Sequence, residues 1–331
     1  SVTEIMVNGS DSIFIERNGH MEKWDKKFES VERLSDVAQR IAAMSNRMVN
    51  EASPVADTRL SDGSRVSIVL PPVAINGPVI TIRKFYDTPL TIERLIELES
   101  ITAEAAEFLS RLVKSRYNIF ISGGTGSGKT TFLNVLSDYI PEDERLVTIE
   151  DSAELQLHNV SNLVRLEARM ANLEGCNAVG IRDLIKASLR MRPDRIVVGE
   201  VRGAEAIDML QAMNTGHDGS LSTGHANSPK DMMTRLETMV LMGMEMPVTA
   251  IRSQISSAID IVVHLARLRD KSRKVVQIAE VGDYIGGEVA LTPLYKFVET
   301  GQDKNGKVFG KLVRQENSLI RTEKLKAAGY M

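Results

Sequence analysis

Cysteine, net charge and long apolar runs are all scarce in this sequence of 331 residues, and each scarcity excludes a class of protein. The single cysteine, Cys176, rules out an internal disulfide and a four-cysteine zinc module, and it suits a reducing compartment. No stretch approaches about 18 consecutive apolar residues and the start lacks a signal-peptide pattern, so we expect any membrane association to pass through a partner. A net charge of −3 and a pI near 6.0 give no overall attraction to nucleic acid.

The composition is otherwise that of a globular protein, with 43% hydrophobic and 26% charged residues. A chain of this length suggests about two domains. A change of pattern near residue 86 sets the boundary. We expect an α+β domain over residues 1–85, a linker over residues 86–94 and an α/β domain over residues 95–331. Ser1 in place of an initiating methionine leaves open whether the natural N-terminus is included.

The first 85 residues combine short strand patterns with one helix pattern. Two short strands are expected over Glu4–Asn8 and Ser12–Glu16, each closed by an Asn-Gly turn. An apolar stripe of helical period predicts a helix over Val31–Val49. Two further strands are expected over Val66–Leu70 and Val79–Phe85. Together these patterns indicate a small α+β domain.

From residue 91 onward, helix patterns alternate with strands of β-branched residues, which predicts a parallel sheet covered on both faces. A polar residue sits at or just past the end of each of the strands Asn118–Ile121, Leu146–Ile149 and Arg195–Val198. Ligands of such sheets lie at the carboxyl ends of the strands. After residue 260 the pattern changes to hairpins and a final helix, expected over Ile261–Leu268, Val275–Asp283, Ile285–Leu291, Tyr295–Thr300 and from Ser318.

Residues 123–130 read Gly-Gly-Thr-Gly-Ser-Gly-Lys-Thr between the strand pattern Tyr117–Ser122 and the helix pattern Thr131–Ile140, the context of a phosphate-binding loop. Its glycines let backbone N–H groups point at phosphate oxygens, and the helix N-terminus adds partial positive charge. Lys129 can reach the β- and γ-phosphates, and Thr130 can bind Mg²⁺. The residues expected to bind nucleotide are Gly123, Gly124, Thr125, Gly126, Ser127, Gly128, Lys129, Thr130 and Thr131. We expect ATP and Mg²⁺ as cofactors, since no Asn-Lys-x-Asp motif for reading guanine is present.

Two acidic segments follow strand patterns and are candidates for the chemistry of hydrolysis. Glu200 ends the buried run Arg195–Val198 plus Gly199, where it can position or deprotonate the attacking water; a surface carboxylate at a strand end is the alternative. Three carboxylates lie within residues 150–154 and would repel a nucleotide unless a cation lies among them. Glu150 is our choice for holding Mg²⁺ or its water.

Histidine and arginine complete the candidate site. His225 follows a short apolar strand pattern and is a candidate phosphate sensor, although a lone histidine is more often structural. A metal site at this histidine is disfavoured because no second ligand lies three or four residues away. Arg65 and Arg83 fall in the small domain, and the residues alone leave open whether they are plain surface charges.

These blocks, taken in order, resemble the secretion ATPases of type II and type IV secretion and of type IV pili. The nearest likeness is to the CpaF-type ATPase of the Tad/Flp pilus, and it covers nearly the whole chain. Most specific are residues 189–203, Leu-Arg-Met-Arg-Pro-Asp-Arg-Ile-Val-Val-Gly-Glu-Val-Arg-Gly, and residues 222–228, Ser-Thr-Gly-His-Ala-Asn-Ser. The resemblance implies a RecA-like P-loop motor domain (α/β) joined to a smaller PAS-like α+β N-terminal domain. It also implies a cytoplasmic homo-hexamer, peripheral at the bacterial inner membrane through platform proteins.

The resemblance assigns roles to residues of this sequence. Residues 123–130 become the Walker A loop, with Lys129 catalytic, and residues 150–154 the Asp box with Glu150. Glu200 becomes the Walker B glutamate, and the stretch that holds His217 and His225 becomes the His box. Arg65 and Arg83 match small-domain arginines that approach the nucleotide, which implies a site between the two domains.

Three other readings are weighed against a pilus or secretion motor. A conjugation-type secretion ATPase would share most of these blocks. A nucleic-acid translocase shares the motor core, but the slightly acidic pI and the lack of a strand combining aromatic and basic residues disfavour it. A scaffold that binds nucleotide without hydrolysis is disfavoured because the acidic and histidine motifs look complete. The sequence leaves open whether the motor extends or retracts a pilus.

Overall fold

The computed structural model describes residues 2–17, 19–45, 47–84, 90–169, 178–304 and 306–330. The chain forms two compact units, Ser1–Thr88 and Pro89–Met331, which are described separately below. Of the predicted linker, residues 86–89 lie outside the described residues, and residues 92–94 belong to a helix, α2 (Ile92–Glu97). Residue 85, the predicted end of a strand, is also outside the described residues.

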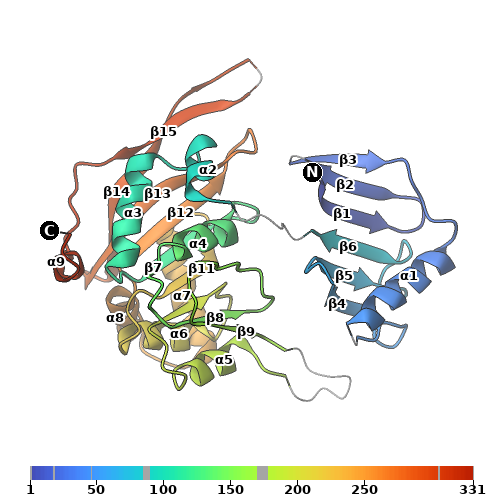
Figure 1. Ribbon diagram of the computed structural model, residues 1–331, viewed down its shortest axis with the longest axis horizontal. Helices are drawn as coiled ribbons and strands as arrows, with labels where there is room; N and C mark the ends of the chain where they lie inside the picture. The colour runs from blue at the N-terminus through green and yellow to red at the C-terminus, as the bar shows by residue number, and fades with distance from the viewer. Residues whose placement is uncertain are drawn as a thin grey trace. The chain divides into compact units, whose positions relative to one another are not determined.

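The first unit is a six-stranded antiparallel sheet with one helix against it (Figure 1). The strand order is β3-β2-β1-β6-β5-β4. Two of the strands, β3 and β4, have no counterpart in the sequence prediction. The elements are β1 (Val2–Asn8), β2 (Ile13–Arg17), β3 (His20–Trp24), α1 (Val31–Met44), β4 (Val55–Arg59), β5 (Arg65–Val69) and β6 (Val79–Arg83).

Helix α1 follows from its sequence at the start but ends earlier than predicted. Ser30 caps it by accepting a hydrogen bond from the Arg33 N–H at 3.1 Å. Leu34, Ala38 and Ala42 are buried against the sheet and Val37 and Ile41 are partly buried, whereas Met44 at the end of the stripe is exposed. The helix stops at Met44, so the predicted end at Val49 was wrong. Val49 is buried, but it lies in an irregular segment after the helix. Its apolar side chain falls at a position that fits the helical period, which is why the sequence pattern extended the helix too far.

The second unit is built on a nine-stranded sheet of order β15-β14-β13-β12-β7-β11-β10-β8-β9. The six neighbouring strands from β12 to β9 run parallel, and β13, β14 and β15 add antiparallel to the β12 side. The parallel strands are β7 (Ile119–Gly123), β8 (Leu146–Glu150), β9 (Leu163–Glu167), β10 (Arg195–Val198), β11 (Leu221–His225) and β12 (Ile261–Arg267). The antiparallel strands are β13 (Arg273–Ile285), β14 (Glu288–Gln302) and β15 (Val308–Arg314).

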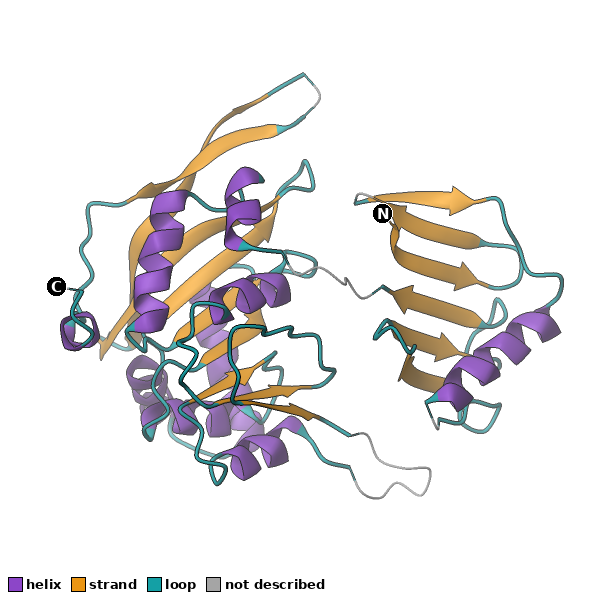
Figure 2. Cartoon of the chain, in the orientation of Figure 1, coloured by secondary structure: helices purple, strands orange, loops and turns teal. Residues whose placement is uncertain are grey.

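Helices cover both faces of this sheet, which confirms the predicted α/β class (Figure 2). One face packs on α3 (Ala103–Lys114) and α4 (Lys129–Ser137) through side chains such as Ile121 and Val263. The other packs on α5 (Ile181–Ser188), α6 (Ala206–Asn214), α7 (Pro229–Gly243) and α8 (Val248–Ala258). Strand residues alternate between the two cores, as in Ile119, Phe120 and Ile121 of β7. Within the described part of the chain, no helix has the length and apolarity needed to cross a membrane.

The hairpin region differs from the sequence prediction in three places. The two strands predicted over residues 285–291 and 295–300 were wrong, because β14 runs continuously through Pro293. The register shifts there, with Ile278 opposite Tyr295 and Ala279 opposite Pro293, and such a bulge tolerates a residue without an N–H. Strand β15 was not predicted; outside this region, neither was β9 at the opposite edge of the sheet. Helix α9 (Glu323–Ala327) begins five residues after Ser318.

A buried ion pair fixes the start of β10 at the amino edge of the sheet. The guanidinium of Arg195, which is 0% exposed, binds the carboxylate of Glu144 with two nitrogens, one of them 2.9 Å from Oε1. Arg195 also donates to the Val113 carbonyl at 2.6 Å. Arg116 adds a second, weaker contact to Glu144 at 3.3 Å. This network ties α3, the segment before β8 and β10 together.

Candidate functional site

The glycine-rich segment forms the turn between the central strand β7 and helix α4. Gly126 and Gly128 have φ angles of +69° and +94°, a left-handed conformation that disfavours side chains. Gly128 is the residue before α4, so the loop ends at the helix N-terminus, where free backbone N–H groups favour anions. Strand, loop and helix thus have the order predicted for a phosphate cradle. Thr125, Gly126 and Thr131 are exposed and Ser127 is buried.

Lys129 lies in the first turn of α4, and its side chain folds back over the loop. The residue is only 7% exposed, and its Nζ donates to the carbonyl of Gly124 at 3.0 Å. Nζ also lies 3.2 Å from Nδ1 of His225. A lysine ammonium has donors only, so Nδ1 of His225 is the acceptor in this contact.

His225 joins the loop to the neighbouring strand end. It is the last residue of β11, next to β7, and its Nε2 lies 2.8 Å from Oε1 of Glu200, which comes two residues after the end of β10. Because Lys129 donates to Nδ1, the proton of a neutral ring sits on Nε2, facing Glu200; this tautomer is assigned from the contacts. Burial lowers the pKa of His225 below its ordinary value of 6.5; Glu200 opposes this, and the Lys129, Arg202 and Arg235 charges add to it. The ring is therefore neutral at pH 7.

Glu200 presents one buried oxygen that has no hydrogen-bond donor aligned with it among the described residues. This atom is Oε1, which lies close to His225 but without the geometry of a hydrogen bond. The other oxygen, Oε2, accepts from Arg202 at 2.7 Å. Arg202 also lies 3.5 Å from Asp151, and its hydrogen bond with Glu200 raises the pKa of the Arg202 guanidinium. A carboxylate that is held at one oxygen by a cation, and whose other oxygen makes no hydrogen bond, can accept one from water at that second oxygen.

Glu150 ends β8, and its side chain passes beside Gly199, one residue before Glu200. A Cβ on Gly199 would lie 2.9 Å from Cγ of Glu150, so a larger residue there would displace the carboxylate. Glu150 is 3% exposed, and its Oε2 accepts from the N–H groups of Glu154 and Leu155 at 2.7 and 3.0 Å. Its Oε1 has no partner among the described residues. Burial raises the pKa of Glu150, and the two N–H groups partly offset the rise.

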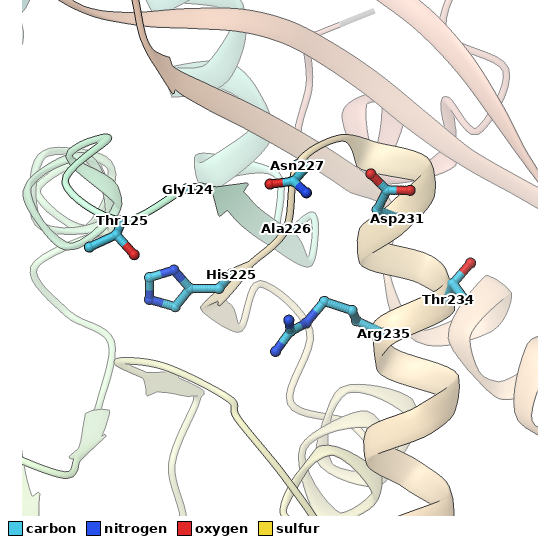
Figure 3. A pocket seen from close by; sticks show the side chains of 8 residues that line it. All are labelled: Gly124, Thr125, His225, Ala226, Asn227, Asp231, Thr234 and Arg235. Carbon is cyan, nitrogen blue, oxygen red and sulfur yellow. The ribbon is translucent and has the colours of Figure 1, made fainter. Parts of the chain in front are cut away.

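A cavity of about 480 Å³ opens beside the loop (Figure 3). Gly124 and Thr125 line one side, and the opposite side comes from the start of α7 with Asp231, Thr234 and Arg235. His225 lies between the two sides, and the guanidinium of Arg235 is directed toward it in Figure 3. The described chain therefore brings the loop, a neutral histidine and a cation together around one space.

The structure adds two arginines that sequence reasoning missed. Arg273 donates through Nε to the Gly126 carbonyl at 2.9 Å, and it lies opposite Arg267 in the β12–β13 hairpin. Nη1 of Arg267 would lie 3.6 Å from a Cβ on Gly126. The signal in the sequence was weak, since both residues fall in an arginine-rich turn far along the chain from the loop.

Other predicted residues do not gather here. His217 lies before β11, at the opposite end of that strand from His225, and its Nδ1 faces the Ala212 carbonyl at 3.2 Å. It is therefore separate from the loop. Arg65 and Arg83 belong to the first unit, where they sit directly opposite each other on β5 and β6. Side chains alternate along a strand, and Val66 is buried against α1, so both arginines lie on the sheet face away from α1.

Comparisons with known proteins bear on the whole chain. The sequence profile described as "Type II/IV secretion system protein" matches residues 1–310. The chain belongs to this family. A putative conjugal transfer protein of Mycobacterium tuberculosis is 36% identical over 296 residues, which cover 88% of this chain and 84% of that protein. The type IV secretion system protein PtlH of Bordetella pertussis is 32% identical over 303 residues, 84% of this chain and 89% of PtlH.

A solved structure agrees with the fold of this member of the secretion family. The crystal structure of the pilus retraction motor PilT with bound ADP has a TM-score of 0.59. It covers 99% of this chain and 84% of that one at 18% identity. At this identity the likeness concerns the fold alone, and it agrees with a large mixed sheet and a smaller antiparallel N-terminal unit.

Proposed function

We propose that this protein is an ATPase that drives a secretion or pilus machine, and that the site around residues 123–130 binds and hydrolyses ATP. The carrying observation is the chain of contacts from Lys129 through His225 to Glu200. It joins a group suited to bind phosphate to a carboxylate suited to orient water. A glycine-rich turn without catalytic function would not need a buried lysine, a neutral histidine and a partly unpaired carboxylate within contact of one another.

Binding rests on the loop. Its backbone N–H groups and the N-terminus of α4 face the phosphates. When nucleotide binds, the ammonium group of Lys129 exchanges its hydrogen bond with the Gly124 carbonyl for contacts with the β- and γ-phosphates. Arg267 and Arg273 lie beside Gly126 of the loop, and with Thr131 they are our candidates to contact the rest of the nucleotide. Thr125 lines the cavity together with His225.

Mg²⁺ is implied by this chemistry, and two residues fit it. The described residues hold no cluster of three or more His, Cys, Asp or Glu able to bind a metal ion, but Mg²⁺ beside phosphates needs only one or two protein oxygens. Thr130, in the first turn of α4, and the unpartnered Oε1 of Glu150 are suitable donors. The ion would neutralise charge that develops on the phosphate oxygens during transfer. A cation near Glu150 would also offset the cost of burying its charge.

Hydrolysis then needs an oriented water. Oε1 of Glu200 can accept a hydrogen bond from it, while Arg202 holds the other oxygen of the carboxylate. His225 contacts both Lys129 and Glu200, so a shift of Lys129 toward the γ-phosphate would be felt at Glu200. This arrangement lets His225 report the presence of the phosphate to the carboxylate that orients the water.

The assembly and its partner belong to the same proposal. We propose a homo-hexamer acting at an inner-membrane platform, in which Arg65 and Arg83 approach the nucleotide when the two units close on it. The Tad-type pilus remains our proposal for the machine. A conjugation-type secretion ATPase is the second candidate, and the names of relatives, among them the conjugal transfer protein TrbB of Rhizobium radiobacter (33% identical over 293 residues), favour it.

The experiment is ATP turnover by the purified chain with and without single-stranded DNA, alongside light scattering for mass. Slow turnover that does not change with DNA, from an assembly with the mass of six 36.5 kDa chains, supports the proposal. Stimulation by DNA would replace it with a nucleic-acid translocase. An assembled ring that binds ATP without hydrolysing it would replace it with a nucleotide-gated scaffold.

A further inference from the structure

A second histidine, His264, is buried beneath the phosphate loop and takes no part in the chemistry described above. It lies on β12 and is 6% exposed. In the pairing of β12 with β7 it stands opposite Ser122, the residue just before Gly123, and its Nδ1 lies 2.8 Å from the Ser122 hydroxyl. Ser122 is fully buried, so this hydroxyl has no water with which to replace the contact.

The imidazole also lies near the segment that follows His225. Burial lowers the pKa of His264, and the charge of Lys129 adds to the lowering, while the nearby Asn227 backbone and Asp231 oppose it. A neutral ring has one donor and one acceptor. Asn227 itself lines the cavity beside the loop.

The backbone next to His264 also touches the loop. A Cβ on Gly123 would lie 2.5 Å from the carbonyl oxygen of Leu265 and 2.6 Å from Oγ of Ser127. The first glycine of the loop is therefore pressed against β12, one residue from the histidine. A sideways shift of β12 by a few tenths of an ångström would change the space available to this end of the loop.

We propose that His264 is a positioning residue that holds the base of the phosphate loop against β12 through its contact with the Ser122 hydroxyl. The Ala226 N–H donates to the Gly123 carbonyl at 3.3 Å, so this contact also sets the position of the Ala226–Asn227 segment relative to the loop. It does not touch the reacting atoms. It acts by fixing the distance between the loop, which holds phosphate, and the strand end that carries His225. The inference rests on the proposed function, because its effect is read through nucleotide binding.

The test compares four variants by their affinity for a fluorescent ATP analogue with Mg²⁺ and by thermal unfolding. His264→Leu and Ser122→Ala each remove the contact, and we expect each to raise the dissociation constant about tenfold, the effect of one buried hydrogen bond. His264→Gln can still donate and accept, so it should stay within about threefold of wild type. The double variant His264→Leu/Ser122→Ala should bind the analogue no more weakly than the weaker-binding of the two single variants, because both substitutions remove the same contact.

Ser188→Ala is the matched control. Ser188 is fully buried like Ser122, and its hydroxyl makes one hydrogen bond, to Ile185 at 2.7 Å on α5. Its melting temperature should fall by about as much as that of Ser122→Ala, while its affinity for the ATP analogue stays that of wild type. If His264→Leu does not fold, Ser122→Ala decides the question alone.

The outcomes separate the inference from the proposed function. A wild-type chain that does not bind the analogue overturns the proposed function. Wild-type binding together with unchanged affinity in Ser122→Ala, or with His264→Gln as weak as His264→Leu, overturns the role of His264. Additive losses in the double variant would also contradict a shared contact.

Discussion

Removing the guanidinium of Arg195 should cost far more stability than removing any surface charge. In Arg195→Met, the one ion pair that Glu144 keeps among the described residues is with Arg116 at 3.3 Å, although its side chain is 10% exposed. The Val113 carbonyl also loses one donor and keeps the Arg116 N–H at 3.1 Å. Breaking a buried pair by removing one partner typically costs about 3–5 kcal/mol, because the other charge stays buried. A unit of this size loses about 2–4 °C of melting temperature per kcal/mol, so we expect a fall of roughly 6–20 °C.

The chain offers a matched control and an internal reference. Arg94→Met breaks an ion pair whose partners are 56% and 64% exposed, and such pairs contribute at most about 1 kcal/mol. Arg195→Met/Glu144→Leu removes both buried charges and should recover more than half of the loss. The only tryptophan, Trp24, lies in the first unit, so the melting of its fluorescence should not change. Far-UV circular dichroism reports both units, so the loss should appear in that signal alone. A loss for Arg195→Met no larger than for Arg94→Met would show that the buried ion pair does not stabilise the second unit.

Three further predictions concern the site. Lys129→Met should abolish detectable nucleotide binding while the melting temperature changes little; retained binding would mean that the loop does not hold phosphate. Burial lowers the pKa of His225 below 6.5, so the proton binds the unfolded chain more tightly. Stability should therefore hold above pH 6.5 and fall as the pH drops below it. Turnover should fall once the pH passes the lowered pKa of His225 in the folded protein, and His225→Gln should flatten this acid limb of the turnover profile. Arg83→Ala should lower turnover more than stability, since Arg83 is 60% exposed and its contact with Glu4 spans 3.9 Å; wild-type turnover would make it a plain surface charge.

The sequence predicted best the elements whose signals are local. The strand Arg195–Val198 has the predicted bounds, because a continuous run of β-branched residues ends at a glycine. The glycine loop between β7 and α4 was predictable for the same reason: its motif needs a strand before it and a helix after it. The errors fall where distant parts of the chain decide the outcome, as at Val49, which is buried by the sheet rather than by a helix.

The contacts within the candidate site depend on topology, and local patterns do not reveal them. Lys129, His225 and Glu200 meet because β7, β11 and β10 are neighbours in the sheet, although the loop and β10 are about 70 residues apart in sequence. Arg273 and His264 were missed because no motif marks them. Arg273 is the first residue of the antiparallel strand β13, and His264 lies in β12. The roles of Glu150, Arg65 and Arg83 stay predictions.

The most direct test of the central claim is Mg²⁺-dependent ATP hydrolysis by wild type and by Glu200→Gln, with nucleotide affinity measured on the same samples. Glutamine keeps the shape of the side chain and the contact region of His225, but it removes the charge that orients and deprotonates water. We predict that Glu200→Gln binds ATP as wild type does and hydrolyses it at least about tenfold more slowly. Unchanged turnover in Glu200→Gln would exclude Glu200 from hydrolysis, and the chain of contacts from Lys129 through His225 would then end at a residue without a role in it.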